Sequence, residues 1–398
     1  MKNTHHLLTL AAAAILAGSA AQAQSLTGFT RITTKTELLS VQGAKADFDA
    51  NALAVGNGGT LYVVDSDSAA GTTGQSILRV VPGSPNTIGL MADQAQLVAA
   101  IEAVNGTTAV TSFSPRQIAV LQNGNIVVTG FTNVANADTI LIMTNAVPAT
   151  ISVLHTSVNG ADSAIDGVEA MTTIGNTIYA ATNENNGNAT TADAIIAFDG
   201  LGTGPALSGV TVINKAGLEA AFGVANESAV NALATDGTDL FGTISVSGTA
   251  PDVVGRITTA GVATVHINKT SVVNALAALD PLVTDVGYGA IAVDANGTVY
   301  LGNSFGTAAS AYDDNIVAVS NISGGAGTVT TISKTDLATI LALPSGTPFV
   351  GNDSLAFDAT NNRIVFSEGS STSPSAEGQW FFSPVAPASS VTNWDMHE

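Results

Sequence analysis

Short hydrophobic runs separated by polar turns recur along the chain at intervals of 52 to 65 residues. Each of six stretches has an apolar run, a turn of Gly, Asn or Asp, and a second run rich in β-branched or aromatic residues. This pattern is typical of a tight β-hairpin. The six hairpins are NALAVGNGGTLYVVD (51–65), RQIAVLQNGNIVVTG (116–130), VEAMTTIGNTIYAAT (168–182), VNALATDGTDLFGT (230–243), GAIAVDANGTVYLGN (289–303) and DSLAFDATNNRIVFS (353–367).

A third apolar run follows every hairpin, and a fourth run follows in the first five units. Four antiparallel strands in each of six units predict an all-β fold, a six-bladed β-propeller of four-stranded blades. The sixth unit stops at its third strand, QWFF (379–382). We expect TGFTRITTK (27–35) to supply its missing outer strand, because this would close the ring and cover an open sheet edge.

Short helices are predicted between the blades. A recurring K-T-x-L-like phrase follows residues of the types that cap helix N-termini, and Thr34 with Glu37 has the spacing of a capping box. Apolar pairs such as Leu97 with Ile101 then repeat at helical spacing. The second unit carries HTSVNGADSAI (155–165) instead, so we expect no helix there. The predicted caps are Thr34, Asp93, Asn214, Asn268 and Ser333.

The chain of 398 residues begins like a secretory protein. Lys2 precedes an apolar stretch, and SAAQAQ offers small residues at a cleavage site, so residues 1–23 are interpreted as a signal peptide. The propeller is predicted over residues 24–384 and a tail over 385–398. Without cysteine the protein has neither disulfides nor thiolate ligands. We therefore expect a secreted or periplasmic protein.

The formal net charge of −20 limits the partners that this chain can bind. Such a surface repels nucleic acid and anionic lipid and favours cations and weak self-association. We expect no nucleic-acid partner, no membrane insertion and a monomeric protein whose partner is an extracellular ligand or protein. The few basic residues also argue against a site that holds several phosphates.

The stretches ALAVGNGGTLYVVD (52–65) and AIAVDANGTVYLGN (290–303) resemble the NHL-repeat and SMP-30 (gluconolactonase-like) six-bladed propellers. The resemblance covers about residues 27–384. It implies the blade architecture and leaves the function open, because this superfamily mixes lactonases, esterases, phosphatases, receptors and scaffolds.

Polar residues at the start of the innermost strands should ring one mouth of the central channel. Carboxylate and amide oxygens are ligands that Ca²⁺ prefers, so a calcium ion is a candidate cofactor. The resemblance to SMP-30 implies Glu169, Asn231 and Asp353 as ligands of a divalent metal. The alternative is that short polar side chains here only cap exposed backbone. The candidate metal ligands are Glu169, Asn231, Asp353 and Asn51, and further mouth residues are Arg116, Gln117, Asp65, Asn183 and Asn303.

Two short motifs are weak evidence for other chemistry. The stretch GNSFG (302–306) matches a nucleophile elbow around Ser304, but it leads from a strand into a polar loop and no histidine is placed as its base. DSDSAAGTTGQS (65–76) lacks the glycine and the glutamate of a calcium-binding EF-hand loop.

Two functions stay open. The first is a secreted, non-catalytic propeller that binds a ligand or a protein, or serves as a structural module. The alternative is a metal-dependent lactonase or esterase that uses Glu169, Asn231 and Asp353. A phosphate-ester hydrolase is a weaker third alternative, because Arg116 is the one basic residue expected near the mouth.

Overall fold

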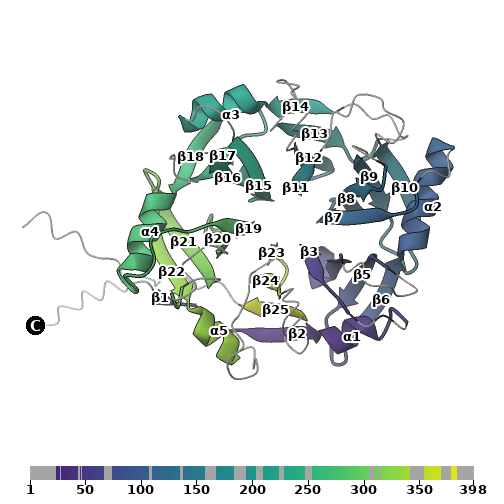
Figure 1. Cartoon of the computed structure of the whole chain (residues 1–398), viewed down its shortest axis with the longest axis horizontal. Coiled ribbons are helices and arrows are strands. Elements are labelled where there is room, and N and C mark those ends of the chain that lie inside the picture. The colour runs from purple at the N-terminus through teal and green to yellow at the C-terminus, as the bar shows by residue number, and fades with distance from the viewer. Residues whose placement is uncertain are drawn as a thin grey trace, which may run out of the picture.

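The computed structural model describes residues 24–26, 28–43, 45, 47–66, 74–106, 110–134, 138–156, 167–182, 194–202, 209–223, 228–246, 253–303, 310–312, 315–340, 354–368 and 378–382. Their strands form six sheets arranged around a central axis (Figure 1). The innermost strands of neighbouring sheets contact one another around the whole ring. The β-propeller predicted from the repeats is therefore confirmed.

Each sheet is a blade, numbered here by the order of its innermost strand. Blade 1 consists of β3 (Ala50–Val55), β4 (Leu61–Asp65), β5 (Ser76–Val81) and β6 (Thr87–Ala92). Blade 2 consists of β7 (Phe113–Val120), β8 (Ile126–Thr132), β9 (Asp138–Met143) and β10 (Ile151–Thr156). Blade 3 consists of β11 (Val168–Ile174), β12 (Thr177–Thr182), β13 (Ile195–Asp199) and β14 (Val210–Ile213).

Blade 4 consists of β15 (Ser228–Thr235), β16 (Leu240–Val246), β17 (Val253–Ile257) and β18 (Ala263–Asn268). Blade 5 consists of β19 (Tyr288–Val293), β20 (Val299–Asn303), β21 (Asn315–Ser323), β22 (Ala326–Ile332) and the added β1 (Gln24–Ser25). Blade 6 consists of β23 (Ser354–Asp358), β24 (Arg363–Glu368), β25 (Gly378–Phe382) and β2 (Thr30–Thr34).

The N-terminal strand closes the ring as predicted. Strand β2 pairs antiparallel with β25, with Thr33 opposite Gln379 and Thr30 opposite Phe381. The two ends of the propeller are thus joined in one sheet, and the edge of β25 is covered (Figure 1).

Blade 5 differs from the expected four-stranded design. Strand β1 adds to its outer edge, where Gln24 and Ser25 pair in parallel with Thr330 and Thr331 of β22. The added strand is held by its apolar neighbour, because Leu26 is only 2 % exposed and packs in the core between blades 5 and 6. The design of four antiparallel strands therefore holds in five sheets, and blade 5 has five strands with one parallel pair.

Short helices lie on the perimeter of the ring (Figure 1). Each of the five predicted cap residues accepts a hydrogen bond from the backbone N–H three residues later, and Thr34 with Glu37 forms the predicted capping box. Residues 157–166, where the sequence predicts no helix, lie outside the described part. The helices are α1 (Lys35–Leu39), α2 (Gln94–Asn105), α3 (Lys215–Phe222), α4 (Lys269–Ala277) and α5 (Lys334–Ile340), with a 3-10 turn, η1, at Asn57–Gly59.

Helices α2, α3 and α4 pack against the outer strand of the next blade. In α3 the Phe222 ring lies so close to Gly255 of β17 that a Cβ there would be 2.5 Å from the ring. The glycine at position 255 allows this close approach, because a Cβ there would force the Phe222 ring or the Ile244 side chain to shift. The helices act as packing elements between blades, as the sequence predicts.

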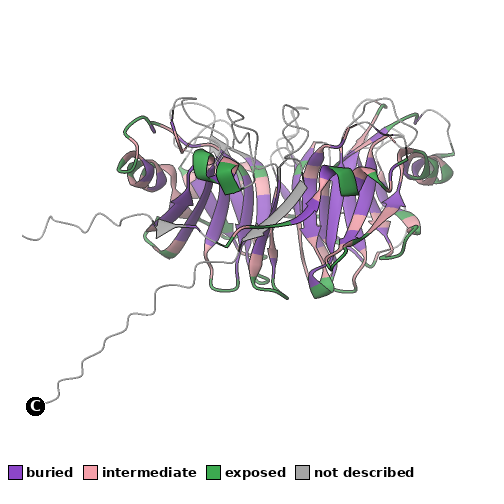
Figure 2. Cartoon of the chain, turned by 90° about the horizontal axis from the view of Figure 1, so that it is seen from below, coloured by how far each residue is buried: buried purple, intermediate pink, exposed green. Residues whose placement is uncertain are grey.

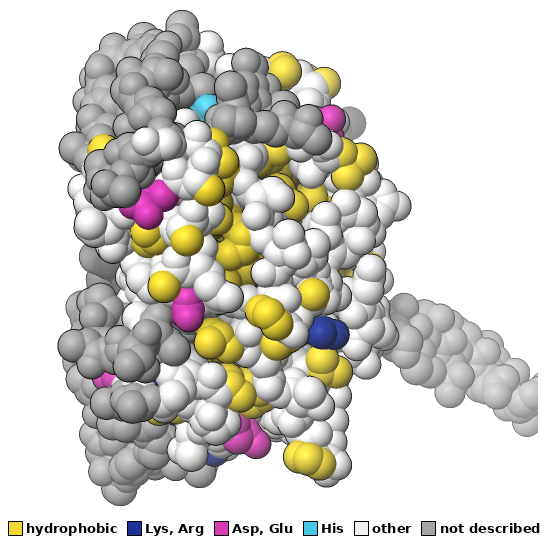
Figure 3. All heavy atoms as spheres, turned by 90° about the vertical axis from the view of Figure 1, so that its right-hand side faces the viewer, with side chains coloured by type: hydrophobic (Ala, Val, Ile, Leu, Met, Phe, Trp, Pro, Cys, Tyr) yellow, Lys and Arg dark blue, Asp and Glu magenta, His cyan; other side chains and the backbone are white. Residues whose placement is uncertain are grey.

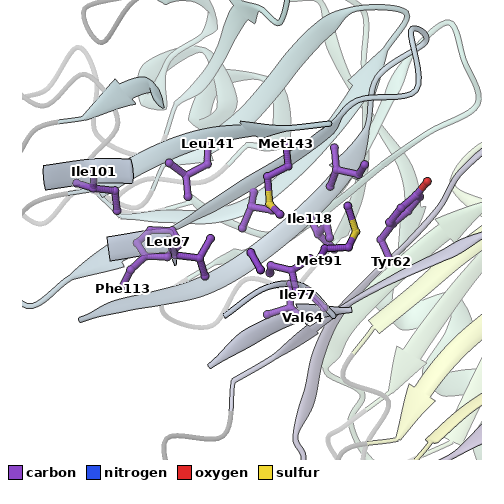
Figure 4. Packing of buried hydrophobic residues seen from close by; sticks show 14 of the residues in the cluster. Tyr62, Val64, Ile77, Met91, Leu97, Ile101, Phe113, Ile118, Leu141 and Met143 are labelled. Carbon is purple, nitrogen blue, oxygen red and sulfur yellow. The ribbon is translucent and has the colours of Figure 1, made fainter. Parts of the chain in front are cut away.

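The core lies between neighbouring blades rather than in one centre. Figure 4 shows the interface of blades 1 and 2, where Ile118 and Met143 meet Tyr62 and Met91 beside α2. The strands are buried along most of their length, and exposed residues gather in the turns and helices (Figure 2). Burial of both faces of every blade explains the apolar, β-branched composition of its strands.

Large and small side chains alternate around the ring of inner strands. Each inner strand contributes at least one large apolar residue that shares a core cluster with an alanine from the inner strand of the preceding blade, so the blades interlock. The sets are Leu53 with Ala356, Ile118 with Ala52 and Ala54, Met171 with Ala119, Leu233 with Ala170, Ile291 with Ala234, and Leu355 with Ala290 and Ala292.

On the side of the ring that Figure 3 draws, charged side chains of the described residues are few. Figure 3 shows the right-hand side of the ring, where isolated acidic and basic groups are separated by hydrophobic and uncharged polar ones. Among the described helices, none is long and apolar enough to cross a membrane.

Candidate functional site

A β-bulge occurs at one position in five of the six innermost strands. In each of them one residue near the strand start has no partner in the register with the second strand. A bulge turns its extra residue out of the regular ladder. The bulged residues are Asn51 of β3, Arg116 of β7, Glu169 of β11, Asn231 of β15 and Gly289 of β19.

These five residues define the bulge mouth of the channel. Arg116, Glu169, Asn231 and Gly289 are exposed, and Asn51 is half-buried. The structure therefore brings the sequence-predicted positions to equivalent places in neighbouring blades. Asp353, the expected counterpart in blade 6, lies outside the described residues.

Blades 2 and 3 are joined directly at this mouth. The Gln117 side chain donates through Nε2 to the backbone oxygen of Glu169 at 2.8 Å. The Arg116 guanidinium lies over the ring of Phe131, with 5.2 Å between its Cζ and the ring centroid. This cation–π contact holds the guanidinium over β8. Neither Arg116 nor Glu169 is among the residues that line the channel cavity.

The channel behind the bulge mouth is narrow and lined by all six inner strands. Its cavity of about 310 Å³ begins at polar residues and continues past Leu53, Ile118 and Leu233. The Ser354 hydroxyl accepts a hydrogen bond from the backbone N–H of Leu53 at 3.0 Å, which ties blade 6 to blade 1. The polar residues at its start are Asn51, Gln117, Asn231, Gly289 and Ser354.

Two sequence-predicted mouth residues lie inside the blades instead. Asp65 is fully buried and forms an ion pair with Lys45, which precedes β3. Asn303 is also fully buried and donates to the backbone oxygen of Tyr312 and to Oδ1 of Asn315. Because neither side chain is exposed, the structure gives both a role in holding strand ends together.

Several other candidates fall outside the described part of the chain. These are Asn183, Ser304 of the GNSFG stretch and most of the DSDSAAGTTGQS loop. Their roles stay as predictions.

The described bulge residues supply oxygen ligands for a cation but few negative charges. Asn51 and Asn231 offer amide oxygens, and Glu169 is the one carboxylate among the five. Within the described residues, no group of three His, Cys, Asp or Glu side chains could hold a metal ion together. A calcium site built on Glu169, Asn231 and Asp353 therefore stays a prediction.

Sequence reasoning found the ring of polar residues but not the bulges that present them. The signal for four of the bulges was a polar residue at the start of the apolar run, and for the fifth it was Gly289; all except Glu169 lie three residues before the central alanine. Sequence reasoning also missed β1, because a strand of two residues has no hydrophobic period.

No protein-family model matches the chain, and no curated protein sequence matches it. Solved structures similar to it include a putative oxidoreductase (glucose dehydrogenase) from Thermus thermophilus, with 11 % identity, a TM-score of 0.49, and coverage of 90 % of this chain and 99 % of that chain. An α-L-arabinofuranosidase from Fusarium graminearum has 9 % identity and a TM-score of 0.49, with 90 % and 97 % covered.

A virginiamycin B lyase from Staphylococcus aureus has 14 % identity and a TM-score of 0.42, with 82 % of this chain and 79 % of that chain covered. Because all these identities and TM-scores are low, the similarity carries no argument about activity. The resemblance to NHL and SMP-30 propellers likewise stays a prediction beyond the propeller fold itself.

Proposed function

We propose that this protein is an extracytoplasmic, monomeric β-propeller that binds a ligand or a protein partner at the bulge mouth. One observation carries the proposal: five inner strands bulge at the same position. A bulge disrupts its ladder, and bulges are over-represented at sheet edges, at barrel rims and next to active sites, where they can re-aim a side chain. Repetition around the ring gives the mouth four presented side chains, two asparagines, one arginine and one glutamate, while Gly289 adds no side chain.

The chemistry of these residues suits recognition by hydrogen bonds. Amide groups of Asn51 and Asn231, which line the channel cavity, both donate and accept. Arg116 and Glu169 do not line the cavity, but as exposed residues of neighbouring inner strands they add one charge of each sign beside it. A rigid scaffold that displays such groups at one end is the usual arrangement of a binding site.

Photo-crosslinking at the mouth tests the proposal. A photoreactive residue, p-benzoylphenylalanine, replaces Asn231 or Arg116 in the exported protein, and a control variant carries it at Val262. Val262 is 61 % exposed but lies in the turn before β18, on the outer side of blade 4. We expect adducts from the mouth positions and none from Val262. Equal crosslinking at all three positions, or none at the mouth, contradicts the proposal.

A metal-dependent lactonase or esterase is the second candidate. It is favoured by the equivalence of Glu169 and Asn231, which occupy the same bulge position in adjacent blades. In such an enzyme a divalent cation would polarise the substrate carbonyl, and Asp353 would be its further ligand.

Metal content and turnover separate the two candidates. If the binding proposal holds, the purified protein shows no turnover on lactones, esters or phosphate esters in the presence of Ca²⁺. Turnover that is lost in Glu169→Gln, but kept in the control Glu102→Gln on α2, would instead establish the enzyme. A tight calcium site raises the melting temperature, because a ligand at 100 times its Kd stabilises the fold by about 2.7 kcal/mol.

A further inference from the structure

The channel widens at the end opposite to the bulge mouth. There the hairpin turns of blades 1, 2, 3, 4 and 6 line a second cavity of about 580 Å³, which we call the hairpin-end vestibule. Ligand pockets usually have volumes of about 300–1,000 Å³, so this space could hold a small molecule. The lining residues that could contact such a molecule most directly are Val55, Val120, Ile174 and Phe357, with Asn57 and Gln122 at the edge.

The vestibule has apolar walls and a polar rim. Val55, Val120, Ile174 and Phe357 come from four different blades, and each is half-buried, with one side in a core between blades. Around them, Asn57, Gln122 and Thr360 are exposed and offer hydrogen-bonding groups. An apolar body with a few polar contacts at its edge fits this arrangement.

All residues that line the vestibule are uncharged, although the chain carries a net charge of −20. Two carboxylates in the adjoining turns are buried and satisfied: Asp294 accepts from the Tyr300 hydroxyl, and Asp358 pairs with Arg363. Asp236, next to Gly237, is exposed and accepts from the backbone N–H groups of Thr238 and Asp239. An anionic ligand would meet no basic lining residue here.

The rim of the vestibule is held rigid by bonds between blades 2 and 3. The Thr173 hydroxyl donates to the backbone oxygen of Val120 at 2.7 Å, and the backbone N–H of Gln122 donates to the oxygen of Gly175 at 2.8 Å. The N–H of Asn123 adds a bond to the side chain of Asn176. A rigid cavity loses little conformational entropy on binding.

We propose that the hairpin-end vestibule is a second binding site, which takes a neutral small molecule with an apolar or aromatic body. Phe357 supplies an aromatic face, and Val55, Val120 and Ile174 supply the opposing walls. This site lies at the opposite end of the inner strands from the bulge mouth, so it does not depend on the function proposed above.

Binding of Nile red, a neutral dye that fluoresces in apolar surroundings, tests the proposal. We expect one dye per chain, with an affinity that falls at least tenfold in Ile174→Glu, because the new carboxylate must lose water when the dye binds. Val262→Glu, which places the same charge on an exposed valine of the outer wall, should bind the dye like the unchanged protein.

A second variant covers the case in which Ile174→Glu does not fold. Thr360 is exposed on the rim, so Thr360→Glu adds a charge there without disturbing a core. We expect it to weaken dye binding several-fold while the melting temperature stays unchanged. Absence of dye binding to the unchanged protein, or equal binding by all variants, overturns the proposal.

The C-terminal segment of the chain is the competing occupant of the vestibule. Residues 383–398 follow Phe382 at the end of β25. Phe382 pairs with Ile364 near the start of β24, and the turn that precedes β24 contributes Ala359 and Thr360 to the vestibule. If dye binds only after deletion of 383–398, and Ile174→Glu abolishes that binding, the vestibule holds the chain's own tail. This outcome also overturns the proposal of a free ligand.

Discussion

The Lys45 ammonium and the Asp65 carboxylate form an ion pair in which neither side chain is exposed. Lys45 also donates to the backbone oxygen of Gly74, and Asp65 accepts from the backbone N–H of Asp49. The pair thus fixes the segment before β3 against the ends of β4 and β5. Lys45→Met leaves a buried carboxylate without its counter-ion, so we expect a loss of about 3–5 kcal/mol in the free energy of unfolding.

Urea denaturation measures this loss, with Lys269→Met as a control. Lys269 pairs with Asp285, but 40 % of the Asp285 side chain is exposed, so water can solvate the carboxylate after removal of the lysine and the change should cost at most about 1 kcal/mol. Similar losses in the two variants would contradict the structural role assigned to the buried pair.

His266 should make the stability of the protein depend on pH. Its ring packs against Phe241 with 5.1 Å between centroids, and its Nε2 is buried without a hydrogen-bond partner among the described residues. Burial lowers the pKa of His266, as does nearby Arg256, while Asp236 opposes the shift. The unfolded chain therefore takes up a proton at a higher pH than the folded chain does.

This contribution to stability is present above the ordinary histidine pKa of about 6.5 and is lost as the pH falls below it. We expect the melting temperature to decrease between pH 7.5 and pH 5, and to decrease less in His266→Gln. The carboxyl groups of Asp47 and Asp280 have lowered pKa values and so titrate below this window. An unchanged pH profile in His266→Gln would show that His266 is not the responsible group.

At the scale of elements, the contact between neighbouring inner strands depends on matched side-chain volumes. Ala292 of β19 is 2 % exposed and shares a core cluster with Leu355 of β23. Ala292→Leu should cost about 1–3 kcal/mol through overpacking, and Leu355→Ala about 2–5 kcal/mol through a cavity.

Exchange of the two residues tests whether they occupy shared space. Because the double variant Ala292→Leu with Leu355→Ala conserves volume, we expect it to lose less stability than the sum of the single changes. Chemical denaturation of the three variants gives the coupling energy. Simple additivity would indicate that the two side chains do not compete for one volume.

The elements that could be predicted from sequence are those set by local chemistry. Hairpin turns rich in Gly and Asn fix neighbouring strands, and capping residues such as Asp93 and Asn268 fix helix starts within one residue. Burial of polar side chains could not be predicted in the same way. Asp65 and Asn303 end their strands as expected, but partners distant in sequence, such as Lys45, determine that they are buried.

At the scale of the molecule, the regular repeat predicted the ring. It also predicted the closure, because the sixth unit has only three strands and its fourth strand must come from the N-terminal segment. The fifth strand of blade 5 could not be predicted, since it depends on the parallel pairing of two residues and on a buried Leu26. The two ends of the channel differ in the same way. Polar residues at the strand starts predict the bulge mouth. The hairpin-end vestibule could not be predicted, because its lining side chains come from different blades that meet only in the ring.

Ring closure can be tested with a disulfide across the closing strands. Thr33 and Gln379 lie opposite each other in β2 and β25, and opposite residues in antiparallel strands have Cα atoms about 4.5–5.5 Å apart, within reach of a disulfide. Because the chain has no cysteine, Thr33→Cys with Gln379→Cys can form only this bond within one molecule.

We expect the bond to form on mild oxidation, seen as a mobility change without reductant, and to raise the free energy of unfolding by about 2–4 kcal/mol, because it closes a very long loop. Thr33→Cys with Phe382→Cys is the control, since it moves one cysteine about 10 Å along β25. If both pairs form equally well, the termini meet without a fixed register. If neither bond forms, β2 does not pair with β25 and does not close the ring. Blade 6 would then lack its outer strand and would not be equivalent to the other blades at either end of the channel.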